Sequence, residues 1–357
     1  MPEFDPPSPP GHLSSAEPVL AALDLGTNNC RLLIARPDGD GNGFTVIDSF
    51  SRIVRLGEGL GRSGRLNERA MGRTIGALKV CARLMARHRV TKARCVATEA
   101  CRRADNGAEF LERVSRMTSL DLEVLSHEGE VGLALLGCVP LIDPTADHVL
   151  LVDIGGGSTE LAWLDRGVAD PANSLRCAVS VPIGVVSLTE MFSPEPDAAT
   201  FAEMVHHVQA CLAPLEMTHR FRTLIDGNQL QMLGTSGTVT TLAAVHLDLP
   251  RYDRREIDGI VVDPDSLTSV ALRLRSMSNA ARTAHPCIGP GRADLVVAGC
   301  AILDAILHYW PADTLRVADR GLREGILHSL MGRTVEGALA AAGTREQSID
   351  CCSENQV

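Results

Sequence analysis

One short pattern occurs twice in the chain, 129 residues apart, and it constrains the fold more than any other feature of the sequence. Leu23-Asp24-Leu25-Gly26 recurs as Val152-Asp153-Ile154-Gly155. In each copy an apolar run ends in Asp, a polar turn begins with Gly, and a second apolar run follows. Two copies of a strand–turn–strand unit predict two similar halves whose turns face each other across a cleft.

The composition of these turns suits phosphate binding. Glycine lets the backbone approach a ligand closely, and successive N–H groups in such a turn form a concave anion site. Ser and Thr hydroxyls add donors, and the Asp at the strand end is placed to hold a divalent cation against phosphate oxygens. A single Gly-rich turn is weak evidence, because such a turn is purely structural about half the time. Two copies at one offset favour the phosphate interpretation.

Length and composition predict two folded domains. The chain has 357 residues, of which 45% are hydrophobic, enough for two cores. The most apolar stretch, near residues 295–307, contains Asp304 and is too short for a membrane span. Residues 1–18 are Pro-rich and lack the basic and apolar parts of a secretory signal, so we expect a disordered leader and a cytoplasmic location. The 11 cysteines are dispersed without a C-x-x-C pair, which favours buried free thiols over disulfides or zinc.

Charge is unevenly distributed along the chain, whose net charge is −10. Residues 52–103 contain twelve Arg and two Lys but only three Glu, a local excess of +11. Such a basic block indicates an anionic partner, although the solvated face of one or two helices gives the same pattern. Nucleic acid is disfavoured, because only 3% of the residues are aromatic and no nucleic-acid-binding motif is present.

Hydrophobic periodicity predicts strands that alternate with helices. A strand–turn–strand pattern covers residues 19–36, and single strands are expected at 93–98 and 148–154. Helical patterns cover 68–89, 106–118, 197–217, 265–278 and 292–310, and strand–turn–helix patterns cover 230–245 and 315–331. This alternation predicts an α/β fold with parallel or mixed sheets.

The turns DLGTNNCRLL and DIGGGSTEL are similar to the paired phosphate loops of the actin/Hsp70/sugar-kinase superfamily. Six further segments resemble, in the same order, those of the Ppx/GppA family of exopolyphosphatases and guanosine pentaphosphate phosphohydrolases. They are VATEACRRADN (96–106), SHEGEVGLALLG (126–137), VPIGVVSLTE (181–190), GTSGTVTTLA (234–243), GPGRADLVVAGCAIL (289–303) and ADRGLREGIL (318–327). The chain resembles the short, two-domain form of that family.

The resemblance implies an α/β fold of two ribonuclease-H-like domains of the actin-like ATPase superfamily. They would face each other across a cleft, with mixed sheets flanked by helices. The first domain is expected at 19–130, completed by a helix at 321–335, and the second at 131–320. Residues 336–357 are expected to form a flexible tail.

The resemblance also implies site residues. Glu130 is expected to be the general base that deprotonates the attacking water, and Asp153 and Glu160 are expected to hold Mg²⁺ or Mn²⁺. The expected phosphate-binding residues are Asp24, Gly26, Thr27, Asn28, Asn29, Arg31, Arg102, Gly155, Gly156, Gly157, Ser158, Thr159, Gly237 and Thr238. Cleavage of a phosphoanhydride needs such parts, because it depends on positioning, charge neutralisation and an aligned water.

Several alternatives stay open on the sequence alone. Glu128 is an alternative base, because the segment around Glu130 departs from the family pattern. The expected reaction is Mg²⁺-dependent, processive release of orthophosphate from inorganic polyphosphate. The alternatives are hydrolysis of guanosine pentaphosphate, an ATP-dependent kinase reaction, and a non-catalytic sensor of polyphosphate or an alarmone. A homodimer is a candidate assembly, and neither nucleic acid nor a membrane is an expected partner.

Overall fold

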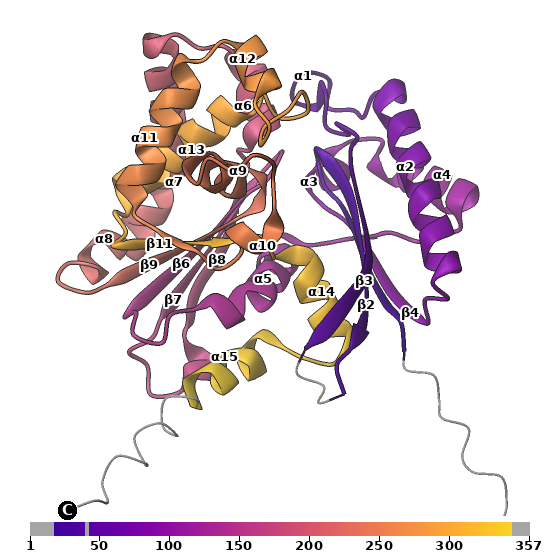
Figure 1. The fold of residues 1–357 in the computed structure, drawn as a ribbon, viewed down its shortest axis with the longest axis horizontal. Coiled ribbons are helices and arrows are strands. Elements are labelled where there is room, and N and C mark those ends of the chain that lie inside the picture. Colours follow the sequence, from indigo (N-terminus) through magenta and orange to yellow (C-terminus); the bar gives the residue numbers. More distant parts are fainter. Residues whose placement is uncertain (1–17, 40–42, 345–357) are drawn as a thin grey trace, which may run out of the picture.

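Two mixed β-sheets, one in each half of the chain, form the framework of the protein (Figure 1). The computed structural model describes residues 18–39 and 43–344. The leader expected at 1–18 therefore lies outside the described residues except for Pro18, as does the part of the expected tail beyond residue 344. Among the described residues, no helix combines the length and apolar character that crossing a bilayer requires.

The first sheet has the strand order β3-β2-β1-β4-β5. Its strands are β1 (Leu20–Leu25), β2 (Asn29–Pro37), β3 (Phe44–Ile53), β4 (Lys92–Ala97) and β5 (Glu123–Val124). The first three strands pair antiparallel, and β1, β4 and β5 pair parallel. The central strand β1 is apolar on both faces because helices or loops cover both, whereas the edge strand β3 is polar and largely solvent-accessible.

The second sheet repeats this topology. Its strands are β6 (His148–Ile154), β7 (Thr159–Asp165), β8 (Leu175–Val181), β9 (Leu230–Thr235), β10 (Val261–Val262) and β11 (Thr314–Ala318). The order β8-β7-β6-β9-β11 corresponds strand for strand to the first sheet, and β10 is added at one edge. The pairing directions also correspond. The expectation of two equivalent halves with mixed sheets is confirmed.

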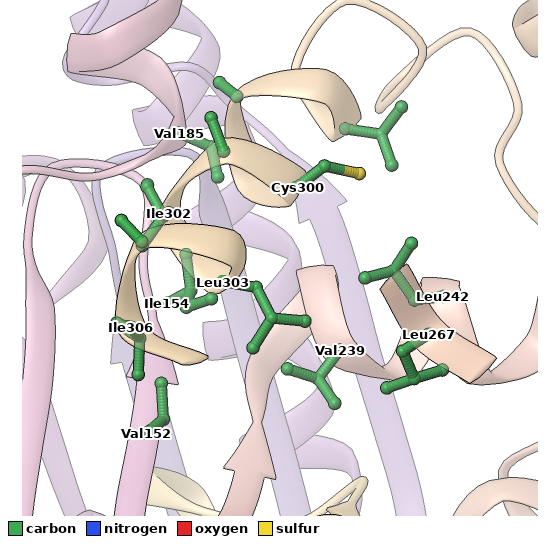
Figure 2. Close-up of a cluster of buried hydrophobic side chains, with 14 of the residues drawn as sticks. Val152, Ile154, Val185, Val239, Leu242, Leu267, Cys300, Ile302, Leu303 and Ile306 are labelled. Atoms are coloured by element: carbon green, nitrogen blue, oxygen red, sulfur yellow. The ribbon is translucent and has the colours of Figure 1, made fainter. Parts of the chain in front are cut away.

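Helices cover the faces of both sheets. Those of the first half are α1 (Leu60–Ser63), α2 (Glu68–Arg87), α3 (Glu99–Arg103) and α4 (Gly107–Thr118). Those of the second are α6 (Val185–Met191), α7 (Ala198–His219), α8 (Phe221–Leu224), α9 (Ser236–His246), α10 (Arg254–Ile257), α11 (Pro264–Ser276), α12 (Asn279–Ala284) and α13 (Val296–Tyr309), with short 3₁₀ turns at Val139–Leu141 and Pro171–Asn173. Figure 2 shows the core of the second half, where Val152 and Ile154 of β6 pack with Ile302 and Ile306 of α13.

Two helices join the halves. Helix α14 (Leu322–Leu330), near the end of the described chain, packs on β1 of the first sheet and crosses α5 (His127–Cys138). The crossing is close because Gly325 and Gly137 lack side chains: a Cβ on either would overlap a backbone carbonyl of the other segment. On the other side of the cleft, Arg55 forms an ion pair with Asp294 (2.8 Å), and Glu190 accepts a hydrogen bond from the backbone N–H of Gly59 (2.7 Å).

Helix α15 (Val335–Thr344) corrects one expectation. The flexible tail was expected to begin at residue 336, but residues 335–344 form this helix. The apolar side chains Val335, Ala338 and Leu339 pack into a cluster with α5 and the second sheet. The segment VEGALAAAG is rich in good helix formers, and burial of this small apolar face stabilises it.

Glycines inside helices give a stability prediction. Gly72→Ala and Gly76→Ala in α2 are each expected to stabilise the protein by about 1 kcal/mol, because an added Cβ meets nothing within 4 Å. The matched control is Gly325→Ala in α14, which is expected to destabilise it because its Cβ would overlap the Leu133 carbonyl. Urea unfolding measures both effects. Equal changes of the midpoint at all three positions would contradict the close crossing of α14 and α5.

Candidate active site

The two turns of the sequence repeat adopt the same structure. The Gly26 N–H donates to the Asn29 carbonyl (2.9 Å), and the Gly155 N–H donates to the Ser158 carbonyl at the same distance. The turns also lie against each other. A Cβ on Gly156 or Gly157 would press on Thr27 or Asn28. These two glycines therefore let the two loops approach each other closely.

A cavity of about 110 Å³ opens between the loops. Both halves of the chain line it, and most of the residues predicted from the sequence are among its walls. These are Asp24, Gly26, Thr27, Asn28, Asn29, Arg31, Glu130, Asp153, Gly155, Gly156, Gly157, Ser158, Glu160 and Gly237. Asn28 is 7% exposed, and its Oδ1 has no hydrogen-bond partner among the described residues. A bound ligand would complete its hydrogen bonding.

Three predicted phosphate-binding residues do not line this cavity. The Thr159 hydroxyl donates to the Ile183 carbonyl (2.7 Å) and is fully buried in β7. Thr238 lines a smaller adjoining cavity and packs tightly against Gly299. Arg102 lies behind Glu130 and forms ion pairs with Glu130 (3.1 Å) and Glu99 (2.8 Å). In this structure the Thr159 hydroxyl is therefore used within the protein, and the Arg102 guanidinium contacts the carboxylates of Glu130 and Glu99.

The structure separates the two candidate bases. Glu130 lines the cavity at the start of α5 and is 8% exposed. Burial raises its pKa to about 7; Arg102 opposes this shift, whereas Asp24 and Asp153 add to it. Glu128 is exposed outside the cavity, and hydrogen bonds to its own backbone N–H and to Ser126 lower its pKa. Of the two, Glu130 has both the position and the pKa that a general base near neutral pH requires.

The two halves differ at one equivalent position beside the loops. In the first sheet Asp24 lies opposite Arg31, and in the second Asp153 lies opposite Glu160. The second half therefore presents two neighbouring carboxyl residues where the first presents an acidic residue opposite an arginine. Burial raises the pKa of Asp153 to about 6, and it raises that of Glu160 well above its usual range, helped by the charges of Glu130 and Asp153.

Sequence reasoning missed part of the cavity wall. Arg292, Arg323, Tyr252 and Asp319 also line it. The guanidinium of Arg323 makes no hydrogen bond or ion pair with any described residue, whereas Arg292 donates to Thr241 (2.8 Å) and lies over the Tyr252 ring. Two arginines directed at the cavity add to Arg31 as groups that bind phosphate oxygens in pairs.

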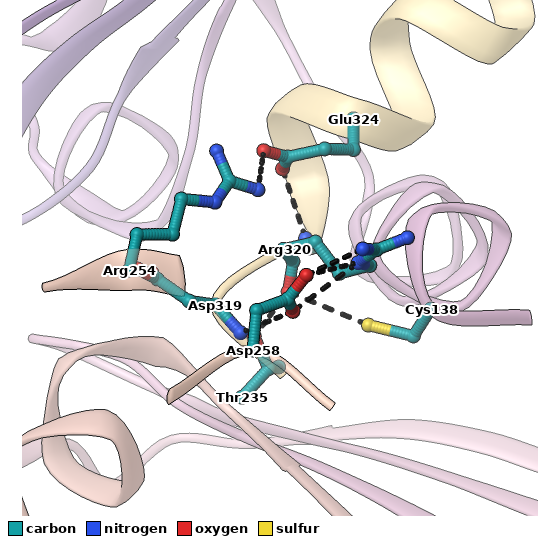
Figure 3. A network of polar contacts seen from close by, with 8 residues as sticks. Cys138, Thr235, Arg254, Asp258, Asp319, Arg320 and Glu324 are labelled. Carbon is teal, nitrogen blue, oxygen red and sulfur yellow. Dashed lines mark hydrogen bonds and ion pairs between the residues drawn. The ribbon is translucent and has the colours of Figure 1, made fainter. Parts of the chain in front are cut away.

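A polar network fixes the turn between β11 and α14 (Figure 3). Arg254 pairs with Glu324 (2.8 Å), whose second oxygen accepts from the Gly321 N–H (3.0 Å). Arg320 pairs with Asp258, and its carbonyl accepts from the Thr235 hydroxyl (2.6 Å). Since Arg323 and Asp319 flank this network in the chain, it holds their backbone in place at the cavity wall. The Arg254–Glu324, Arg320–Asp258 and Thr235–Arg320 contacts join residues 62 to 85 positions apart. No local sequence motif predicts contacts of this kind.

Comparison with known proteins places this geometry in a family. The model of the Ppx/GppA phosphatase family matches residues 33–334. The chain belongs to the Ppx/GppA phosphatase family. It is 31% identical to "Exopolyphosphatase 2" of Mycobacterium tuberculosis, covering 88% of this chain and 98% of that one.

Solved Ppx/GppA structures have the same fold. The family member from Aquifex aeolicus is 31% identical, with a TM-score of 0.70 over 88% of this chain and 97% of that one. An exopolyphosphatase-like protein is 30% identical, with a TM-score of 0.78 over 88% and 98%. The likeness covers nearly the whole described chain, so both sheets belong to the family fold.

The Ppx/GppA cavity suits a divalent cation, on which the family generally depends. Six carboxyl groups and four guanidinium groups line it. An anionic substrate meets repulsion from these carboxylates unless a cation offsets them. No group of three or more Asp, Glu, His or Cys side chains among the described residues is arranged to hold a metal by itself.

Proposed function

We propose that this protein is an exopolyphosphatase that hydrolyses the terminal phosphoanhydride bond of inorganic polyphosphate and releases orthophosphate. The observation that carries the proposal is the buried carboxyl of Glu130 in the wall of a cavity formed by two phosphate loops. The loops supply backbone N–H groups for the phosphates. The carboxylate supplies a proton acceptor for water. The family membership and the exopolyphosphatase relatives support the same reaction.

Different residues of the cavity take different parts in the proposed reaction. The loops at Gly26–Asn29 and Gly155–Ser158 bind the terminal phosphates, and Arg31, Arg292 and Arg323 neutralise negative charge on the chain. Glu130 takes a proton from a water in line with the bond that breaks. Arg102 positions this carboxylate through its ion pair. The terminal phosphorus gains the water oxygen, and the shortened chain leaves with the bridging oxygen.

Asp153 and Glu160 are the residues proposed to hold Mg²⁺, or Mn²⁺ in its place. The Glu160 side chain is 2% exposed and lies opposite Asp153 across the β6–β7 pair. When bound, the cation would offset the charge that develops on the phosphate oxygens. Glu160 also accepts a hydrogen bond from Ser180 (2.8 Å), which orients its carboxylate.

The carboxyl cluster makes stability depend on pH and metal. The raised pKa values of Asp24, Glu130, Asp153 and Glu160 mean that the folded protein binds these protons more tightly than the unfolded chain. The contributions of Asp153 and Glu130 are fully present below pH ~4 and are lost as pH rises through about 6 and about 7, respectively. Mg²⁺ binds the deprotonated forms, so its stabilising effect is expected to be larger at pH ~8 than at pH ~5.

Thermal unfolding with Mg²⁺ or with EDTA at the two pH values checks this expectation. Glu160→Gln is the matched variant, because it removes one carboxylate of the proposed metal pair without changing the size of the side chain. It is expected to reduce the Mg²⁺-dependent rise in melting temperature. A rise that is equal at both pH values, or equal in the variant, would refute the assignment of this cluster as the metal site.

Guanosine pentaphosphate hydrolysis and polyphosphate sensing remain the competing functions. The experiment is orthophosphate release from long-chain polyphosphate, guanosine pentaphosphate and ATP in parallel, each with Mg²⁺ and with EDTA. We expect the highest kcat/KM on polyphosphate and no release with EDTA. A higher kcat/KM on guanosine pentaphosphate would contradict polyphosphate as the preferred substrate. Binding of polyphosphate without any release of orthophosphate would contradict the proposed hydrolysis.

A further inference from the structure

No Arg or Lys of the basic block at residues 52–103 lines the cavity. The four arginines of the cavity wall, Arg31, Arg292, Arg320 and Arg323, all lie outside this block. The proposed reaction uses only Arg102 of this block, through its ion pair with Glu130. It leaves the rest of the largest local excess of positive charge in the sequence without a role. Much of this charge lies on α2, on the outer side of the first half of the molecule (Figure 1).

Five cations occupy one face of α2. Arg69, Arg73, Lys79, Arg83 and Arg87 are all exposed. At 100° per residue they fall within about one third of the helix circumference. The distance from the first to the last is about 27 Å along the helix axis. Arg73 pairs with Glu58 (2.6 Å), and the other four make no hydrogen bond or ion pair with any described residue. We call these five residues the α2 basic face.

Two glycines without side chains lie between these cations on the helix surface. Gly72 and Gly76 are exposed on the same face, and a Cβ at either would meet nothing within 4 Å. Packing therefore does not explain them, and each costs the helix stability relative to Ala. Without side chains at these two positions, a chain-like ligand can lie close to the helix while the cations reach it from both sides.

One end of the α2 basic face is connected to the first phosphate loop. The Arg73 guanidinium donates to the Val54 carbonyl (3.0 Å). The backbone N–H groups of Val54 and Arg55 donate to the Asn28 carbonyl (2.9 and 3.0 Å). Arg73 is thus linked to the loop that lines the cavity through one intermediate segment, Val54–Arg55. From Arg73 the α2 basic face extends along the outside of the helix, away from this loop (Figure 1).

We propose that the α2 basic face is an exosite for a distal part of the same polyphosphate chain whose end is bound in the cavity. This inference rests on the proposed function. Charge complementarity favours a polyanion, and the face carries no aromatic side chain for stacking nucleobases. It also exposes no large apolar side chain for insertion into a membrane. A flexible chain of phosphates without bases fits these properties best.

The test is the variant Arg69→Gln/Lys79→Gln/Arg83→Gln/Arg87→Gln. Glutamine keeps the helix propensity and removes four charges. The KM for long-chain polyphosphate is expected to rise about tenfold and to lose most of its salt dependence, with kcat unchanged. The KM for tripolyphosphate, whose few phosphates the loops of the cavity would bind by themselves, is expected to stay the same. The matched control removes four exposed charges from the second half, in Arg220→Gln/Arg222→Gln/Arg251→Gln/Arg255→Gln, and is expected to behave as wild type.

The two substrates separate the two proposals. Failure of the wild type to release orthophosphate from tripolyphosphate or long chains would refute the proposed function. The exosite would then be tested by direct binding of long-chain polyphosphate to wild type and variant. An equal change in KM for both chain lengths, no change for either, or an equal effect in the control variant would overturn the exosite. Loss of binding to single-stranded DNA or anionic vesicles, with unaltered polyphosphate kinetics and binding, would assign the face to another partner.

Discussion

Glu130→Gln is expected to lower the rate of orthophosphate release from polyphosphate by about 10³-fold. The amide keeps the size of the side chain and cannot accept the proton of the attacking water. The burial that raises the pKa of Glu130 to about 7 makes this carboxyl the strongest base among those whose position suits the role. Polyphosphate binding is expected to persist, since the phosphate loops are unchanged. Steady-state release, together with a binding measurement, checks both parts.

Glu128→Gln is the control for this substitution. The two residues lie in the same first turn of α5, but Glu128 is exposed outside the cavity. Its replacement is expected to leave the rate within about twofold of wild type, because surface substitutions rarely disturb a fold. A large loss in Glu128→Gln with normal turnover in Glu130→Gln would reverse the assignment. In the wild type, the rate at limiting substrate is expected to fall as pH drops below the pKa of the base.

Asp153→Asn is expected to abolish metal-dependent turnover, with a loss of about 10³-fold. Asp153 and Glu160 are the two cavity carboxyls that lie opposite each other on paired strands. Removal of one charge leaves the proposed cation with a single protein carboxylate. The concentration of Mg²⁺ needed for half-maximal activity is therefore expected to rise steeply, as a titration of the residual activity would measure.

Asp319→Asn provides the matched control. It is the same chemical change in the same cavity, but Asp319 lies on the side of the β11–α14 turn, beside Tyr252 and Arg254. Its Mg²⁺ requirement is expected to match that of the wild type, whatever its effect on substrate binding. If the Mg²⁺ requirement rises in Asp319→Asn and not in Asp153→Asn, the assignment of the metal to Asp153 and Glu160 is wrong.

Much of the fold could be predicted because one local pattern occurs twice. At residues 23–26 and 152–155, an apolar strand that ends in Asp-x-Gly is followed by a tight turn and a returning strand. The structure accordingly has the same turn hydrogen bond at Gly26 and Gly155. Strand β3 was not predicted, since it is an edge strand whose polar, exposed residues carry little of the apolar alternation that reveals a half-buried strand.

Residues that act through distant contacts could not be predicted in the same way. Thr159 follows the Gly-rich turn in sequence, yet its hydroxyl donates to the Ile183 carbonyl inside the protein, 24 positions later. Arg102 resembles a phosphate ligand in sequence, but only the fold brings it to Glu130, 28 positions later. Arg323 reaches the cavity because α14 returns to the first sheet, which depends on the glycine crossing with α5.

The time course of chain lengths during digestion of long-chain polyphosphate with Mg²⁺ tests the proposed exopolyphosphatase reaction most directly. An enzyme that binds the chain end in this cavity is predicted to release orthophosphate from the first time point. Undigested chains would stay long while others disappear, and the whole pattern would be absent in Glu130→Gln. Shorter polyphosphates that appear before orthophosphate would show internal cleavage, and binding without any orthophosphate would show a sensor. Either result would contradict hydrolysis from the chain end by Glu130.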